Sequence, residues 1–323
     1  MAKIKKNNSC GVGGQAVMEG VMMKNKEKYA VAVRKPNGEI EVMTSEYKTI
    51  APNKKLTEIP FIRGVFNFVD SMVLGTKCLT YSSEFFEDEE EKKEKGFFEK
   101  KLGDKATKVF TGLTVAFSII VAIALFMVLP YYISRIFEMY IMSTSLLALL
   151  EGVVRILIFV CYVAAISFMK EIKRVYMYHG AEHKCINCIE KGYPLTVKNV
   201  MKASKQHKRC GTSFMLFVMF VSVIFFIFIH VQSPIMRVVV RILLIPVIAG
   251  VSYEIIRLAG SSNNIIIRIL SAPGLWLQRL TTREPDEEMV EVAIKSVEAV
   301  FDWKQFLKEK FDYDVDGSEE DDV

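Results

Sequence analysis

Histidine and cysteine are both scarce in this chain of 323 residues, which contains four histidines and six cysteines. Six cysteines in a chain of this length do not form the dense disulfide framework of a small secreted domain. No basic stripe carries interleaved aromatic residues, so we expect no nucleic-acid partner. The basic residues 1–6 are followed by the polar, glycine-rich residues 7–14 rather than by an apolar core. We therefore expect no signal peptide.

Apolar residues, in contrast, make up 51% of the chain, and the mean hydropathy is +0.25. They gather in four long runs, which are roughly Val109–Leu129, Leu146–Met169, Phe214–Val231 and Val238–Tyr253. Each run approaches or reaches the roughly 20 residues that cross a bilayer as a helix, and a helix satisfies every backbone polar group within the lipid. The sequence predicts a mainly α membrane protein with a four-helix transmembrane bundle.

The loops between these runs predict the orientation. Lysine and arginine are dense between the second and third runs, whereas Arg135 is the one basic residue between the first and second. Basic loops remain on the cytoplasmic side. We expect the N- and C-termini and the loop of residues 170–213 to be cytoplasmic.

Several smaller elements are predicted outside the four runs. Alternating strands flank Asn37-Gly38 within residues 29–47, which indicates a small cytosolic β-hairpin. Residues 61–81 are apolar but contain charges, which is typical of an interfacial or re-entrant helix. Residues 265–280 suit a helix on the inner leaflet that breaks at Pro273-Gly274, and Pro285 opens an amphipathic helix. We expect a charged, solvated linker at residues 84–95 and a disordered acidic tail at residues 312–323.

These elements divide the chain into five predicted regions. They are a cytosolic N-terminal segment (1–60), an interfacial helix with a charged linker (61–108), the membrane core (109–258), cytosolic interfacial and amphipathic helices (259–311) and the tail (312–323).

Two pairs of ionisable residues lie in or beside the apolar runs. Glu151 and Arg155 are spaced i,i+4, and Glu254 and Arg257 are spaced i,i+3. Both pairs lie near predicted helix ends, so we expect pairing within each helix and a structural role. Residues 13–20 are rich in small residues but lack the Lys-Ser/Thr of a phosphate loop. Glu19 in this segment remains a candidate to reach a functional site.

The predicted loop 170–213 carries the chemistry. His179, Glu182 and His183 form a His-x-x-Glu-His pattern, in which two imidazoles bind Zn²⁺ and the carboxylate acts as a general base. On a helix the two histidines face the same side, although Gly180 makes an irregular turn equally compatible with the pattern. The third ligand would come from His207, Cys188, Cys210 or Glu190.

A second metal site is compatible with the same loop. Cys185-x-x-Cys188 and His207-x-x-Cys210 have the spacing of a closed Cys₃His zinc site. Such a site would be structural, and it leaves His179, Glu182 and His183 unexplained. The simplest alternative is that these polar groups only form hydrogen bonds that shape the loop.

Five segments resemble the YqhQ family of bacterial membrane proteins, over nearly the whole chain from Gly13 to the helix after Pro285. They are Gly13-Gly-Gln-Ala-Val-Met-Glu-Gly-Val-Met22, Pro60-Phe-Ile-Arg-Gly64, Tyr178-His-Gly-Ala-Glu-His-Lys184, His207-x-Arg-Cys-Gly-Thr-Ser213 and Thr282-Arg-Glu-Pro285. Members of this family are described as predicted metal-dependent enzymes, and the resemblance implies a location in the bacterial cell membrane. The family more often has a small polar residue at position 185, which favours a site built from His179, His183, His207 and Cys210. Lys208 stands where the family pattern has proline, which should alter the turn but not the ligands.

The leading hypothesis is a zinc-dependent hydrolase at the cytosolic membrane face, acting on a lipid-linked, peptide or membrane-proximal substrate. In this hypothesis His179, His183 and either His207 or Cys210 bind the metal, and Glu182 is the general base. The alternative is a non-enzymatic scaffold or assembly factor with a structural Cys/His zinc site that binds a protein partner. A transporter is a distant third, because the spans contain few central charges and no paired broken helices.

Overall fold

A computed structural model of the chain describes residues 8–86, 109, 112–229, 231, 233–261 and 264–313. The chain forms two compact units. The first contains Met1–Phe85, Val163–Phe217 and Ala249–Val323, and the second contains Phe86–Tyr162 and Val218–Ile248. The predicted linker and tail lie largely outside the described residues, at 87–108 and 314–323.

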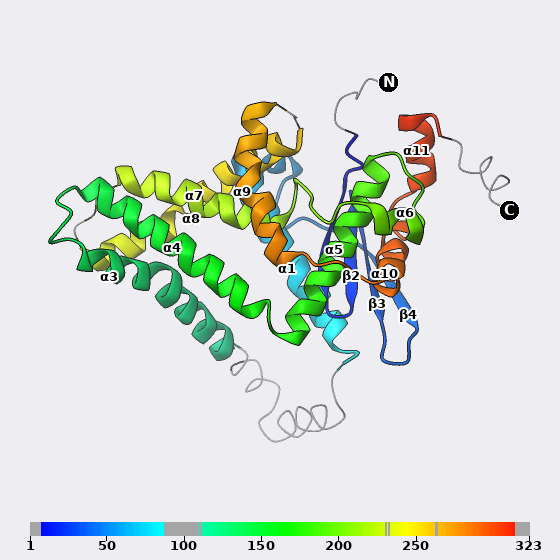
Figure 1. The fold of residues 1–323 in the computed structure, drawn as a ribbon, viewed down its shortest axis with the longest axis horizontal. Helices are drawn as coiled ribbons and strands as arrows, with labels where there is room; N and C mark the ends of the chain where they lie inside the picture. Colours follow the sequence, from blue (N-terminus) through cyan, green and yellow to red (C-terminus); the bar gives the residue numbers. More distant parts are fainter. Residues whose placement is uncertain are drawn as a thin grey trace, which may run out of the picture. The chain divides into compact units, whose positions relative to one another are not determined.

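The first unit contains a four-stranded antiparallel sheet with the order β1-β2-β3-β4 (Figure 1). Its strands are β1 (Val12–Val17), β2 (Gly20–Asn25), β3 (Lys28–Arg34) and β4 (Ile40–Glu46). The predicted hairpin around Asn37-Gly38 is confirmed, since β3 pairs with β4 from Lys28↔Glu46 to Arg34↔Ile40. The β1–β2 hairpin was not predicted. Its turn contains Glu19 with φ 48°, a left-handed conformation that is uncommon for glutamate.

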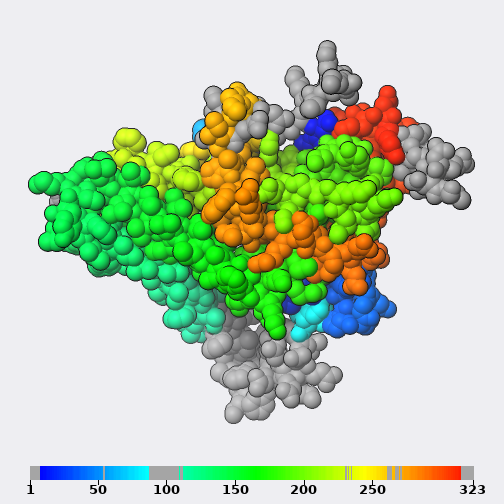
Figure 2. All heavy atoms as spheres, viewed as in Figure 1, coloured from blue at the N-terminus to red at the C-terminus, as the bar shows by residue number. Residues whose placement is uncertain are grey.

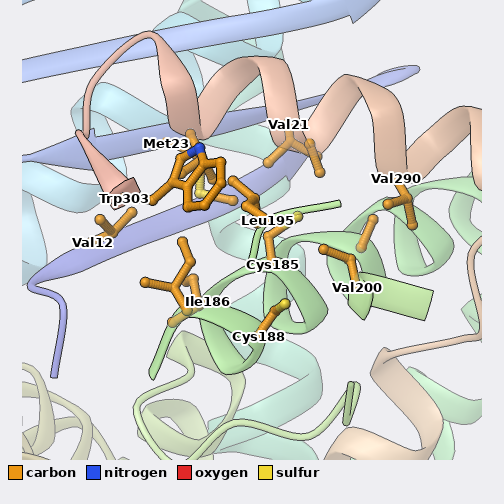
Figure 3. Packing of buried hydrophobic residues seen from close by; sticks show 14 of the residues in the cluster. Val12, Val21, Met23, Cys185, Ile186, Cys188, Leu195, Val200, Val290 and Trp303 are labelled. Atoms are coloured by element: carbon orange, nitrogen blue, oxygen red, sulfur yellow. The ribbon is translucent and has the colours of Figure 1, made fainter. Parts of the chain in front are cut away.

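Helices α5 (Lys170–Glu190) and α10 (Glu287–Glu298) pack on this sheet. Together with α6 (Val197–Lys202) and α11 (Trp303–Phe311) they form the apolar core of the first unit. Val21 and Met23 from β2, Ile186 from α5 and Val290 from α10 are buried in one cluster (Figure 3). The spheres of α5 and α6, in green, and of α10 and α11, in orange to red, form a continuous surface (Figure 2).

The predicted amphipathic helix after Pro285 is confirmed as α10. Asp286 caps it by accepting a hydrogen bond from the Met289 amide at 2.8 Å. Val290 and Val297 of the predicted apolar face are fully buried, and Ile294 and Phe301 are partly buried against the same cluster.

Each of the four predicted apolar runs is helical over most of its described residues. The candidate membrane spans are Gly112–Ile136, Thr144–Ile166, Gly211–Phe228 and Ile235–Ala259, each long and apolar enough to cross a bilayer. The first contains a π-helical turn, η2 (Ala124–Val128), followed by α3 (Leu129–Ile136). The others correspond to α4 (Thr144–Ile166), α7 (Gly211–Phe228) and α8 (Pro234–Ser261).

Three further helices complete the described fold: η1 (Lys54–Thr57), α1 (Ile62–Ser83) and α9 (Ile265–Thr281). The helix expected at residues 61–81 is present as α1. The expected break at Pro273-Gly274 was wrong, since α9 is continuous through both residues. A proline in a helix removes one hydrogen bond and bends the helix without having to end it. Gly274 meanwhile allows close packing, because an added Cβ would lie 2.7 Å from Ser213 Oγ.

Glu254 was expected to pair with Arg257 on the same helix. It pairs instead with Arg63, so the contact joins α8 to α1. Glu254 Oε2 lies 2.5 Å from Arg63 Nη2, and Glu254 Oε1 accepts a second bond from Arg63 Nε at 2.7 Å. The planar guanidinium suits such a two-point contact with a carboxylate. Gly64 beside it packs on Tyr253, whose Cβ would be 2.7 Å from an added Cβ. The Pro60–Gly64 segment therefore ties α1 to α8 within the first unit.

Candidate metal site

Helix α5 presents His179, Glu182 and His183 on one face. Spacings of three and four residues place side chains above one another on a helix, and the two imidazole centroids are 4.4 Å apart. Gly180 does not interrupt the helix. Glycine is needed at this position because an added Cβ would overlap the carbonyl oxygen of Arg283. The Arg283 amide in turn donates to Tyr176 O at 2.9 Å. The segment after α9 thus crosses α5 at Gly180.

Cys210 completes a group of three potential ligands. It immediately precedes α7, and its Sγ lies 3.2 Å from His179 Nε2. One ligand atom from each of His179, His183 and Cys210 lies within 4.8 Å of the others. Two imidazoles and a thiolate are ordinary zinc ligands, and catalytic zinc sites use three protein ligands with one open position.

Backbone carbonyls fix the orientation of both imidazoles. His179 Nδ1 lies 2.9 Å from Thr281 O, and His183 Nδ1 lies 2.7 Å from Lys205 O. A carbonyl only accepts, so each Nδ1 must donate its proton. In the neutral ring the lone pair is then on Nε2, the atom that faces Cys210 in His179. Metal-binding histidines usually have this outer hydrogen bond, which sets the tautomer and the ring orientation.

The electrostatics of the group favour a thiolate at Cys210. Burial alone would raise the pKa of Cys210, but the neighbouring His179 and His183 hold it well below its usual value. Burial alone would lower the pKa of His179, but the charge of Cys210 outweighs burial and raises it. The Thr212 amide, at the start of α7, donates to Cys210 Sγ at 3.4 Å. Helix N-termini stabilise thiolates, and the thiolate is the form that binds metal.

Glu182 lies beside the three ligands. Its Oε2 is 3.8 Å from His179 Nε2, and the residue is 4% exposed. Strand β1 passes directly over it at Gly14, where an added Cβ would lie 2.9 Å from Glu182 Cγ. Close packing on this carboxylate therefore explains Gly14 of the Gly13–Met22 segment.

Cys185 and Cys188 are not part of the group. Both point into the apolar core beneath α5 (Figure 3), and the Cys188 thiol donates to Pro194 O at 3.4 Å. Burial raises the pKa of Cys188 to about 12 and that of Cys185 well above its usual value. Both are therefore neutral thiols, which are poor ligands. The structure does not assemble the Cys₃His arrangement that the spacing allowed, because a helix turns Cys185 and Cys188 away from His183.

His207 and Glu190 form a neighbouring pair. His207 Nε2 lies 3.3 Å from Glu190 Oε2, and Glu190 also pairs with Arg209 and accepts from the Cys10 amide at 3.1 Å. The His207 ring is 5.8 Å from that of His183, but its Nε2 is already directed at Glu190. His207 therefore lies next to the three ligands without joining them.

Glu19, the remaining candidate, is bound elsewhere on α5. Its carboxylate pairs with Arg174 and accepts from the Tyr178 hydroxyl at 3.3 Å. Through these two contacts Glu19 holds the β1–β2 turn against α5. Tyr178 directly precedes His179 in the chain, so Glu19 has a positioning role.

Three contributors to the site were not predicted. Thr281 and Lys205 act through their carbonyl oxygens, which no side-chain pattern reveals. Lys184 is 4% exposed and bridges Met201 O, Ala203 O and Glu284, whose Oε2 is 2.9 Å from its Nζ. The presence of Glu284 in the Thr282–Pro285 motif was a signal for this contact, but its partner could not be identified from the sequence.

The fold and the site together define a mainly helical protein with four candidate membrane spans and a buried His/Cys group able to hold a metal ion. The chain belongs to the family described as a protein of unknown function (DUF1385), whose model matches residues 59–303. It is similar to the uncharacterized protein YqhQ of Bacillus subtilis (strain 168), with 36% identity over 291 residues, 88% of this chain and 90% of that protein. This confirms the resemblance to the YqhQ family. No solved structure matches the chain.

Proposed function

We propose that this protein is a membrane-embedded, zinc-dependent hydrolase whose site lies at the cytosolic face. The observation that carries the proposal is the group of His179, His183 and Cys210, with both Nδ1 atoms anchored by carbonyl oxygens and the potential ligand atoms within 4.8 Å of one another. Three protein ligands leave one position of a tetrahedral zinc ion for water or substrate.

The residues around the group supply the remaining chemistry. Bound zinc lowers the pKa of a water molecule to about 7. Glu182, beside His179, would take a proton from the attacking water. The oxygen of that water would bond to the electrophilic carbon or phosphorus of the substrate. The same proton then passes to the leaving group, so hydrolysis consumes one water and leaves Glu182 unchanged. The substrate class that fits a site beside membrane spans is a lipid-linked, peptide or membrane-proximal molecule.

Metal content tests the ligand set. Purified wild-type protein in detergent should contain near-stoichiometric zinc by elemental mass spectrometry, and His179→Ala should lose it because one of three ligands is removed. Cys185→Ala is the matched control, since Cys185 lies on the same helix but points into the core. Loss of zinc in the control alone, or no metal in the wild type after reconstitution, would contradict this ligand set.

Glu182→Gln separates catalysis from metal binding. The amide keeps the shape of the side chain but cannot accept a proton, and loss of a general base typically slows a reaction about 10²–10⁴-fold. We expect Glu182→Gln to retain zinc and to fail in complementing a deletion strain. Glu171→Gln, an exposed glutamate of the same helix, should complement normally. Full complementation by Glu182→Gln would argue against the hydrolase.

The burial of the group favours a second candidate function. Glu182 and His183 are 4% and 1% exposed, and Cys210 is 4% exposed. A structural zinc ion there would tie α5 to the start of α7 and support a scaffold or assembly factor with a protein partner. Under this alternative, His179→Ala abolishes complementation and zinc binding together, whereas Glu182→Gln preserves both.

A further inference from the structure

The second unit contains a cavity of about 480 Å³. Its walls come from α3, the first part of α4, the end of α7 with the residues that follow, and the first part of α8. Binding sites for small molecules typically measure about 300–1,000 Å³. None of the residues of the His/Cys group lines this cavity, so any ligand here is separate from the proposed metal.

One carboxylate in the cavity wall is surrounded by three guanidinium groups. Glu151 Oε1 lies 2.8 Å from Arg155 Nη2 and 2.5 Å from Arg241 Nη1, while Glu151 Oε2 lies 3.9 Å from Arg237 Nη1. Glu151, Arg155 and Arg241 are 3%, 6% and 5% exposed. The expected pair of Glu151 and Arg155 is therefore present, but it is part of a larger buried cluster.

The charges of this cluster do not cancel. Glu151 supplies one negative charge against the three positive charges of Arg155, Arg237 and Arg241, so this cluster has a net charge of +2. Arg237 and Arg241 lie in the wall of the cavity, whereas Arg155 does not line it. The other two charged lining residues, Arg135 and Glu138, pair with each other at 3.2 Å. Among the described residues, the Glu151 cluster thus keeps an excess of two positive charges within candidate membrane spans, where uncompensated charge is costly.

Aromatic rings and a carbonyl hold these two guanidiniums in place. Arg241 Cζ lies 4.7 Å from the centroid of Phe226, and Arg237 Cζ lies 4.6 Å from that of Tyr131. Arg237 donates to Val231 O through Nε and Nη2. Arg241 Nε has no hydrogen-bond partner although it is buried. Two fixed guanidiniums with unused donors form a recognition site for a planar or tetrahedral oxyanion.

We propose that this cavity binds a phosphate group that carries at most one ester bond. Such a group carries about −1.5 to −2 charges at neutral pH, which matches the excess of two positive charges in the cluster, whereas a carboxylate or phosphodiester supplies one. The group can come from free phosphate or from the headgroup of a phosphatidate-type lipid. Leu147, Ala148 and Val240 give the same cavity an apolar side that suits the lipid.

Binding to the full-length protein in phosphate-free detergent tests the proposal. Radiolabelled inorganic phosphate is measured by equilibrium dialysis, and dioleoyl phosphatidate is compared with dioleoyl phosphatidylcholine by native mass spectrometry. Saturable binding of phosphate supports recognition of the bare anion, and binding of phosphatidate alone supports the lipid headgroup. The proposal is overturned if neither phosphate nor phosphatidate binds, or if phosphate does not bind and the two lipids bind equally.

Arg237→Gln is the primary variant, because the Arg237 side chain is 31% exposed. Its removal leaves the buried contacts of Glu151 with Arg155 and Arg241 intact. We expect phosphate binding to weaken at least about tenfold, because the variant loses one charge-assisted contact. Arg257→Gln, at an exposed arginine of the same helix outside the cavity lining, is the matched control and should bind like the wild type. Equal affinity in both variants contradicts the site.

Glu151→Gln tests the proposal independently and replaces Arg237→Gln if that variant does not fold. It removes the carboxylate that competes for Arg241, so binding should tighten about tenfold. Unchanged or weaker binding in Glu151→Gln would overturn the proposal.

Discussion

Gly14 shows how a missing side chain shapes the site at the scale of a single residue. An added Cβ would lie 2.6 Å from Met22 O, 2.8 Å from Met23 Sδ and 2.9 Å from Glu182 Cγ. Gly13, the preceding residue of the same strand, has no atom within 4 Å of that position. The two glycines therefore form a matched pair.

We expect Gly14→Ala to lower the free energy of unfolding by about 1–3 kcal/mol, the usual cost of overpacking, and to weaken zinc binding by displacing Glu182 and α5. Gly13→Ala should change stability little, because its methyl group enters open space. Thermal unfolding and zinc titration of both variants measure the difference. A Gly14→Ala protein as stable as Gly13→Ala would show that β1 does not press on Glu182.

At the scale of secondary-structure elements, Asp70 connects α1 to the segment that follows β4. It accepts hydrogen bonds from the Tyr47 hydroxyl at 2.5 Å, the Thr49 hydroxyl at 2.6 Å and the Ile50 amide at 2.8 Å. Burial alone would raise the pKa of Asp70, but these bonds and the charge of Lys24 outweigh burial and lower it. Each of the three donors would be left without an ionised acceptor if the carboxylate were lost.

A depressed carboxyl pKa stabilises the fold above the unfolded-state pKa, about 3.9, and this contribution is lost as the pH falls through the folded-state pKa. We expect Asp70→Asn to cost about 1–3 kcal/mol at pH 7, with a difference from wild type that shrinks below about pH 4. Urea unfolding at several pH values measures this. Glu58→Gln, at an exposed carboxylate, should show no such convergence, and a pH-independent cost at Asp70 would contradict the assignment.

The elements that could be predicted are those with a local signal. The four candidate spans follow from long apolar runs, and the β3–β4 hairpin follows from alternation around Asn37-Gly38. The β1–β2 hairpin could not be predicted because its turn uses Glu19 at a positive φ instead of glycine. In the site, the spacing of His179 and His183 predicted their shared face. The choice of Cys210 over Cys188 depended on tertiary packing, which puts Cys188 in the core and brings the start of α7 to α5.

Orientation in the membrane is a prediction at the scale of the whole molecule. The basic residues of 170–213 predict that this region is cytoplasmic and that the short connection at 137–143 is outside. In a Cys161→Ser background, which removes the one exposed cysteine of the described residues, Met142→Cys should react with a membrane-impermeant maleimide in intact cells.

Tyr193→Cys, in contrast, should react only after permeabilisation. Met142 and Tyr193 are 98% and 57% exposed, so a lack of labelling would reflect the membrane barrier rather than burial. The reverse labelling pattern would invert the topology and remove the cytosolic site from the proposal.

The anchoring of His179 on the Thr281 carbonyl has a consequence for biosynthesis. All three ligands leave the ribosome before Thr281 does, and N-terminal parts of a chain fold first during synthesis. The ligands therefore exist for a time without the carbonyl that fixes the tautomer of His179 and without the segment that crosses Gly180. Metal loading would then be a late event that follows completion of α9, so a chain that holds its metal has also completed that helix.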